Sequence, residues 1–127
     1  MSYTIANNTL TFNSDKSVEF DSTIGNVIET HGNVIVLVED VLEKKIALSE
    51  MTFPHASHNI LCFNLNGQLL WKIENKYSYS GEDQNPYLSL NQDENGILWA
   101  HSWAGMTVII NPIDGTIKPR NLGSRPW

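Results

Sequence analysis

The chain has 127 residues, of which 41% are hydrophobic, and its mean hydropathy is −0.24. These values predict one soluble globular domain over residues 1–127 and exclude a transmembrane helix, since no apolar run is long enough. The first residues have neither a basic start nor an apolar stretch, so we see no signal peptide. A single cysteine, Cys62, excludes an internal disulfide and fits a reducing compartment, so we expect a cytoplasmic protein.

The charge is unevenly distributed along the chain. Residues 1–115 contain all 14 carboxylates and five lysines, whereas Lys118, Arg120 and Arg125 lie in the last twelve residues. We therefore expect a flexible basic tail at about 118–127 and an acidic body that repels nucleic acid and favours basic partners. The acidic excess also fits ordinary solubility charge.

The first forty residues contain short apolar runs separated by turn residues. Runs at 3–6, 9–12 and 16–20 predict a strand meander. Residues 26–30 and 34–39 flank His31-Gly32-Asn33, which predicts a hairpin. Residues 34–38 are apolar at every position, as in a central strand that is covered on both faces.

Residues 39–59 show no clear period, and the apolar spacing within 40–48 supports neither a helix nor a strand. The segment is a long insertion between two predicted hairpins. Long insertions in compact β domains are often functional.

Residues 59–75 predict a hairpin, and its register can be chosen from the sequence. A two-residue turn at Asn66-Gly67 would pair Cys62 with Trp71 and scatter the apolar residues over both faces. A type I turn from Asn64, with Gly67 in a left-handed bulge position, separates apolar from polar residues better. This register places one apolar set on a single face: Leu61, Phe63, Leu69, Trp71 and Ile73.

The rest of the chain predicts a surface loop at 74–85, a strand at 87–90 and two further hairpins. The hairpin formed by 97–101 and 106–110 has two possible turns. A two-residue turn at Ala104-Gly105 would put Trp99 and Trp103 on one core face, whereas a three-residue bulge turn would put Trp103 at an exposed tip. We expect Trp99 in the core and leave Trp103 open.

About ten short strands with hairpin turns predict an all-β protein. We expect an antiparallel meander of hairpins that forms a sandwich or a strongly bent, barrel-like sheet.

No motif in the sequence carries a recognisable chemistry. His55 and His58 are three residues apart, but no second cluster completes a zinc site. Cys62 lies within a predicted strand, and neither a nucleophile elbow nor a phosphate-binding glycine loop occurs. We therefore expect a protein that is not an enzyme, with no cofactor and no metal.

The candidate residues for partner binding lie in the irregular segments. Acidic side chains there are free to protrude, and tyrosines are enriched in interfaces. Alternatively, the tyrosines belong to a loop that packs back on the sheet, and the sequence supports this interpretation equally well. The candidates are Tyr77, Tyr79, Glu82, Asp83, Glu39, Asp40, Glu43 and Trp103.

The order of several motifs resembles a known class. The motifs are Phe20 to Ile24, Asn59 to Gly67 with Leu70 to Glu74, Asn85-Pro86-Tyr87, Asn95 to Ala100, and Trp103-Ala104-Gly105 with Ile110 to Gly115. Together they resemble small β-rich bacterial immunity proteins of contact-dependent inhibition and other polymorphic-toxin systems.

The resemblance implies an antitoxin that binds a cognate toxin domain of the nuclease type and masks its active site without catalysis. A second hypothesis is a structural or adaptor module of propeller-like hairpins that self-associates. A third is a small-molecule or carbohydrate binder that uses tryptophan and tyrosine.

Overall fold

The computed structural model describes residues 3–20, 23–39, 58–74, 87–102 and 105–120. These residues form eleven strands and no helix. The strands are β1 (Tyr3–Ala6), β2 (Thr9–Phe12), β3 (Ser17–Glu19), β4 (Ile24–Thr30), β5 (Asn33–Val38), β6 (Ile60–Asn64), β7 (Leu69–Lys72), β8 (Tyr87–Gln92), β9 (Leu98–Ser102), β10 (Thr107–Ile110) and β11 (Ile117–Pro119).

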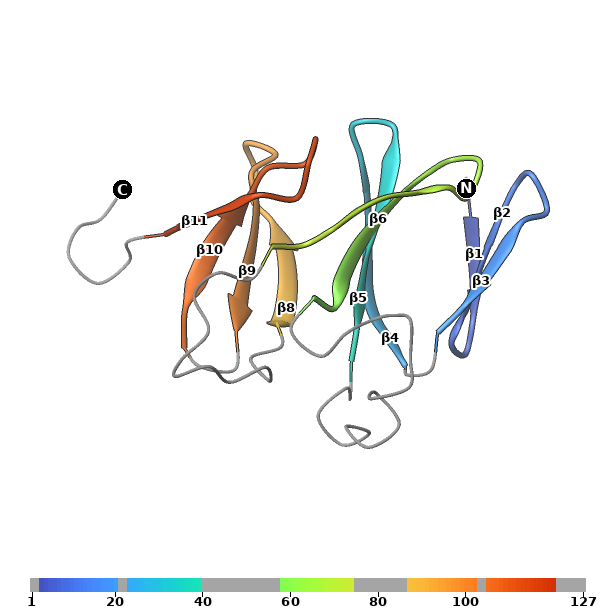
Figure 1. Cartoon of the computed structure of the whole chain (residues 1–127), viewed down its shortest axis with the longest axis horizontal. Helices are drawn as coiled ribbons and strands as arrows, with labels where there is room; N and C mark the ends of the chain where they lie inside the picture. The colour runs from blue at the N-terminus through green and yellow to red at the C-terminus, as the bar shows by residue number, and fades with distance from the viewer. Residues whose placement is uncertain (1–2, 21–22, 40–57, 75–86, 103–104, 121–127) are drawn as a thin grey trace.

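The strands form three antiparallel sheets in which neighbours along the chain are neighbours in space. We call them the N-terminal sheet (β1–β3), the central sheet (β4–β7) and the C-terminal sheet (β8–β11). Figure 1 shows the three sheets side by side, with the central sheet in the middle. The all-β fold of antiparallel hairpins predicted from the sequence is confirmed, and the strands described here do not close into a barrel.

Two apolar clusters hold the stack together. One joins the central and C-terminal sheets and is built around Ile35, Ile60, Trp71, Leu90 and Leu98. The other joins the central and N-terminal sheets: Leu10, Phe12, Phe20, Val34, Val36, Val38, Leu61 and Phe63. The central sheet is therefore covered on both faces, whereas each outer sheet joins a cluster through one face in the part of the chain that the structure describes.

Strand β5 contributes to both clusters. Val34, Val36 and Val38 lie in the cluster with the N-terminal sheet, whereas Ile35 and Leu37 lie in the other one. All five side chains are at most 2% exposed. Successive side chains of a strand point to opposite faces, so a strand covered on both sides needs an uninterrupted apolar run. The predicted central strand is confirmed.

The turn between β6 and β7 has the predicted form. The Asn64 side-chain Oδ1 accepts hydrogen bonds from the N–H groups of Asn66 and Gln68, at 2.9 and 3.0 Å. The N–H of Gly67 donates to the Asn64 carbonyl at 3.0 Å, and Gly67 has a φ of 87°. Asparagine and glycine thus occupy the two positions that this turn requires.

The register of the β6–β7 hairpin changes beyond the turn. Phe63 pairs with Leu69 as predicted, but Cys62 then pairs with Trp71, so Leu70 is an extra residue in β7. Such a bulge reverses the faces of all residues that follow it. Leu69 and Leu70 are left 44% and 47% exposed on this edge strand.

The prediction that Trp71 and Ile73 share a face with Leu61 and Phe63 is wrong because of this bulge. Trp71 and Ile73 face the C-terminal sheet, whereas Leu61 and Phe63 face the N-terminal sheet. On the face towards the C-terminal sheet, the Trp71 indole N–H donates a hydrogen bond to the Pro112 carbonyl at 3.0 Å. A buried indole needs such a partner.

The hairpin of β9 and β10 has the bulge turn and not the two-residue turn. The N–H of Ser102 donates to the Met106 carbonyl at 2.8 Å, and the N–H of Gly105 donates to the Ser102 carbonyl at 3.0 Å. Leu98 and Ala100 consequently face the core. Trp99 lies on the opposite face and is half-buried, so the expectation that it belongs to the core is wrong.

The predicted basic tail at about 118–127 begins too early in the chain. Lys118 and Pro119 belong to β11, and the Arg120 N–H donates to the Thr107 carbonyl at 2.8 Å. Residues 118–120 therefore continue the sheet because their backbone pairs with β10. Residues 121–127 lie outside the described residues.

The two four-stranded sheets have the organisation of propeller blades. In each, four consecutive strands follow one another across the sheet, and the two sheets pack face to face. A propeller closes a ring of at least four such blades. The three sheets described here form an open stack.

Two glycines with positive φ test the packing of Trp71. Gly115 has a φ of 78°, and a Cβ there would lie 2.5 Å from Cε3 of Trp71. Gly32 has a φ of 76° but nothing lies within 4 Å of such a Cβ. We expect Gly32→Ala to cost about 1 kcal/mol through backbone strain. Gly115→Ala should cost about 1–3 kcal/mol more, because it also overpacks the core.

Urea denaturation of the two variants measures this difference. Equal losses of unfolding free energy would contradict the contact between Gly115 and Trp71.

Candidate functional site

Most of the predicted partner-binding residues lie outside the described residues. These are Asp40, Glu43, Tyr77, Tyr79, Glu82, Asp83 and Trp103. Only Glu39 is described. The candidate site is therefore defined by the described residues that flank the two ranges 40–57 and 75–86. Those flanking residues are Glu39, His58, Glu74 and Tyr87.

Glu39 directly follows β5 and is exposed. Its N–H donates to the Thr23 carbonyl at 2.7 Å, which ties the end of β5 to the start of β4. Its side chain lies against Gly25, where a Cβ would collide with it. Gly25 lies at the register shift of β4. Because glycine has no Cβ, it leaves the space that the Glu39 side chain occupies.

The buried side chain of Asn59 connects three segments of the chain. Its Nδ2 donates to the carbonyls of Val38 and Tyr87, both at 2.9 Å, and its Oδ1 accepts the Tyr87 N–H at 2.9 Å. The Val38 N–H in turn donates to the Asn59 carbonyl at 2.9 Å. Asn59 is 0% exposed, so these bonds satisfy the polar groups of a dry site.

Two further hydrogen bonds bring in the end of β7. The Tyr87 hydroxyl donates to the Glu74 carbonyl at 2.9 Å. His58 Nδ1 lies 2.7 Å from the Ile73 carbonyl. The residues Val38, Glu39, His58, Asn59, Ile73, Glu74 and Tyr87 thus meet at one end of the stack, and we call them the Asn59 junction.

The Asn59 junction was not predicted from the sequence. Its members are far apart in the chain, and the only local signal was an asparagine immediately before an apolar strand. The structure therefore brings together the starts and ends of both ranges that carry the predicted acidic and tyrosine residues. It does not describe Trp103, although it shows that the turn containing it is the bulge form.

Much of the negative charge of the chain belongs to the two ranges that begin and end at the junction. Residues 39–58 and 74–87 together contain seven of the 14 carboxylates and three lysines. Of these seven carboxylates, those of Glu39 and Glu74 are described, and the Glu74 Oε1 accepts the Ile117 N–H at 3.0 Å.

Cys62 is the one cysteine of the chain, and it lies in the core between the central and C-terminal sheets. Burial raises the pKa of its thiol to about 11. The thiolate is the reactive form of cysteine, so this thiol is poorly suited to nucleophilic attack.

The described histidines lie apart from one another. His31 is in the β4–β5 turn, His58 is at the junction, and His101 is on the outward face of the C-terminal sheet, with Nδ1 2.9 Å from Thr107 Oγ1. In the part of the chain that the structure describes, no three His, Cys, Asp or Glu residues are grouped as metal ligands would be. Among the same residues, no helix is long and apolar enough to cross a membrane.

Replacing Asn59 tests the junction. Asn59→Leu keeps the approximate volume but leaves the carbonyls of Val38 and Tyr87 without this donor. We expect a loss of about 3 kcal/mol or more in unfolding free energy, at about 1–3 kcal/mol for each unpaired group. Tyr87→Phe removes the hydroxyl bond to Glu74, keeps the bonds of Asn59, and should cost about 1 kcal/mol. Guanidinium denaturation compares them, and equal losses would rule out the junction as described.

The raised pKa of Cys62 predicts that the folded protein loses stability at alkaline pH. Its pKa in the folded protein, about 11, is above the ordinary value of 9.0. The contribution of the neutral thiol to the unfolding free energy is therefore complete below pH 9 and is lost as the pH rises towards 11. Between these limits the wild type should lose about 2 kcal/mol more than Cys62→Val, which cannot ionise. Urea denaturation at both pH values measures this, and identical losses would contradict the shift.

The chain was compared with known proteins and protein families. No curated protein and no solved structure gives a significant match. One family matches residues 1–122, which is nearly the whole chain, and its description is "Domain of unknown function (DUF7957)". A match of this extent assigns the family, and the small β-rich protein described above belongs to DUF7957.

Proposed function

We propose that the protein is an immunity protein, an antitoxin of the cytoplasm that binds a cognate bacterial toxin domain and masks its active site. The observation that carries this proposal is the Asn59 junction, where the two acidic ranges begin and end. A toxin that cleaves nucleic acid needs a basic cleft to hold phosphates. Carboxylates can occupy that cleft in place of the phosphates, so no enzymatic activity of the antitoxin is required.

The junction supports a joint binding surface because it is rigidly bonded. Both ranges start and end at residues joined to Asn59 or to its neighbours by hydrogen bonds of 2.7–2.9 Å. Fixed ends reduce the conformational freedom that the two ranges lose when a partner binds. The charge of the ranges accelerates association with a basic partner.

The stack of sheets supports a second candidate function, a structural or adaptor module of propeller-like hairpins. Among the described residues, each outer sheet contributes one face to the two apolar clusters, so its other face is the one that a second copy would contact. Sedimentation at increasing protein concentration separates the two candidates. The antitoxin stays monomeric without its toxin, whereas the module associates.

The direct experiment is co-expression with the protein encoded by the neighbouring gene. The antitoxin proposal requires that this protein contain a toxic domain, that the two co-purify in equal amounts, and that the chain restore growth. A stable, non-toxic neighbour that does not bind would refute the proposal.

Charge reversal tests the binding surface within that complex. Glu82→Lys combined with Asp83→Lys should weaken binding and slow association by at least about tenfold, because attraction to the basic cleft is replaced by repulsion. The matched control is Glu29→Lys with Glu94→Lys. Glu29 pairs with Val34, at the other end of β5 from Val38, and Glu94 lies in the β8–β9 turn, at the other end of β8 from Tyr87. Both residues are exposed.

Stopped-flow association at low and high salt provides the measurement, since salt screens exposed charges. Thermal melting of both double variants should remain near that of the wild type. If the control slows association as much as the Glu82→Lys and Asp83→Lys variant does, only the net charge matters and the surface lies elsewhere.

A further inference from the structure

Strand β11 is an edge of the C-terminal sheet in the part of the chain that the structure describes, where it pairs with β10 alone. An edge strand has a row of N–H and C=O groups with which another strand can pair. Alternate residues direct these groups to opposite sides of the strand. The Arg120 N–H donates to the Thr107 carbonyl of β10. Ile117 and Pro119 consequently direct their backbone groups away from β10, to the outer side of β11.

No N–H group of residues 117–119 is left for another strand on this outer side. The Ile117 N–H donates to Oε1 of Glu74 at 3.0 Å. The N–H of Glu74 itself donates to the Gly115 carbonyl at 3.0 Å, which holds Glu74 beside the start of β11. Pro119 has no N–H group. Proline on an edge strand is one of the means by which proteins prevent further strand pairing.

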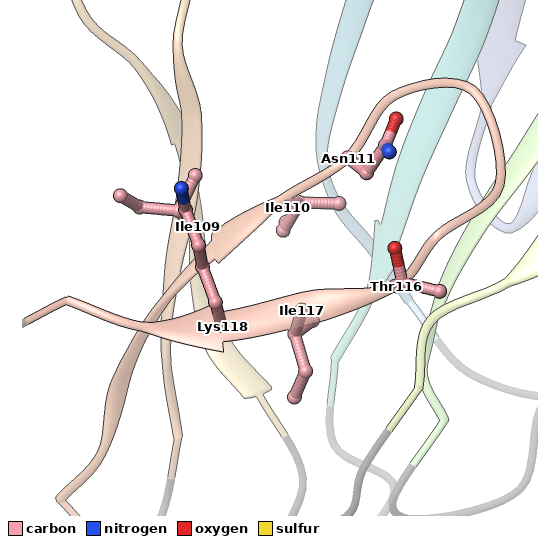
Figure 2. Close-up of a pocket in the computed structure, with 6 residues that line it drawn as sticks. All are labelled: Ile109, Ile110, Asn111, Thr116, Ile117 and Lys118. Atoms are coloured by element: carbon pink, nitrogen blue, oxygen red, sulfur yellow. The ribbon is translucent and has the colours of Figure 1, made fainter.

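Lys118 adds a charge to the same edge. Its side chain is exposed and extends alongside Ile109, its cross-strand neighbour, while the Ile117 side chain leaves the other face of β11 (Figure 2). Suppose that β11 of a second copy paired antiparallel with this strand, about a two-fold axis at Lys118. Ile117 of each copy would then lie opposite Pro119 of the other, and the two lysines would lie opposite each other. Like charges in that position are destabilising.

The other edge of the C-terminal sheet, β8, is also covered by side chains. The Asn59 amide bonds both the N–H and the carbonyl of Tyr87, each at 2.9 Å. Asn26 of β4 donates from Nδ2 to the Leu90 carbonyl at 2.7 Å. Side-chain amides thus take the place of a neighbouring strand along β8. Both edges of this sheet therefore have their outward backbone groups engaged by side chains of other segments.

We propose that Glu74 and Pro119, assisted by Lys118, prevent a second copy of the chain from adding its β11 to this sheet. A hydrogen-bonded pair between Ile117 and residue 119 of the other copy exchanges two bonds, and each residue must supply an N–H. In the native chain the first N–H is bonded to Glu74 and the second does not exist. The proposal does not rest on the antitoxin function, which concerns the ranges 40–57 and 75–86.

Two double variants test the role of Glu74 with the same change of charge. Both contain Pro119→Thr, which supplies an N–H at position 119. Glu74→Met removes the acceptor of the Ile117 N–H, whereas Glu74→Gln keeps an oxygen that can accept it. We expect the variant with Glu74→Met to dimerise at least about tenfold more tightly than the variant with Glu74→Gln, because its dimer gains the Ile117 bonds of both copies.

Sedimentation velocity at increasing protein concentration measures the dissociation constants, at high salt so that charge repulsion is screened. The proposal is overturned if the two double variants have equal dissociation constants, or if the variant with Glu74→Met and Pro119→Thr stays monomeric. It is also overturned if the wild type associates as strongly as that variant, a result that would favour association through the outer faces of the sheets.

Amide hydrogen exchange gives a second measurement, which requires no association. In dilute single variants, the Ile117 amide should exchange at least about tenfold faster with Glu74→Met than with Glu74→Gln, because only glutamine keeps the amide bonded. Equal exchange rates would show that the Glu74 side chain does not protect this edge. Circular dichroism of every variant checks that the fold is retained.

Discussion

The fold depends on the burial of β5 from both sides. Five consecutive apolar side chains alternate between two faces, so no single partner layer can remove all of them from water. Burying each one is worth about 1.5–3 kcal/mol, which is large beside the net stability of a small domain. The N-terminal and C-terminal sheets supply the two covers, and the three-layer stack follows. Because the inner faces are occupied by packing, the surfaces left for recognition are the outward faces and the two ends.

The sequence predicts those features of the fold that local patterns determine. The hairpin turn at Asn64 and Gly67 follows from side-chain hydrogen bonding and from positive φ, and the central strand follows from its unbroken apolar run. The bulge at Leu70 could not be predicted in the same way, because what stabilises it is distant. Trp71 reaches a carbonyl at Pro112, 41 residues further along the chain. The face of Trp99 was likewise decided by a turn whose two forms fit the sequence equally well.

Even less of the candidate site than of the fold could be predicted from local sequence patterns. Composition identified acidic and tyrosine-rich ranges, but composition contains no information about where their ends lie in space. That information comes from Asn59, whose partners Val38 and Tyr87 are 21 and 28 residues away. An asparagine before a strand is common in loops, so its burial and its three hydrogen bonds become visible only in the folded chain.

The Asn59 junction also bears on how freely the chain can vary. Closing a loop costs entropy that grows only with the logarithm of its length, so doubling a loop costs about 0.6 kcal/mol once its ends are fixed. The junction fixes the ends of both ranges with bonds that involve no residue between 40 and 57 or between 75 and 86. Changes in the length of these ranges therefore cost little loop-closure entropy. Under the proposed function, a recognition surface built on such a base can follow a changing partner while the three sheets stay the same.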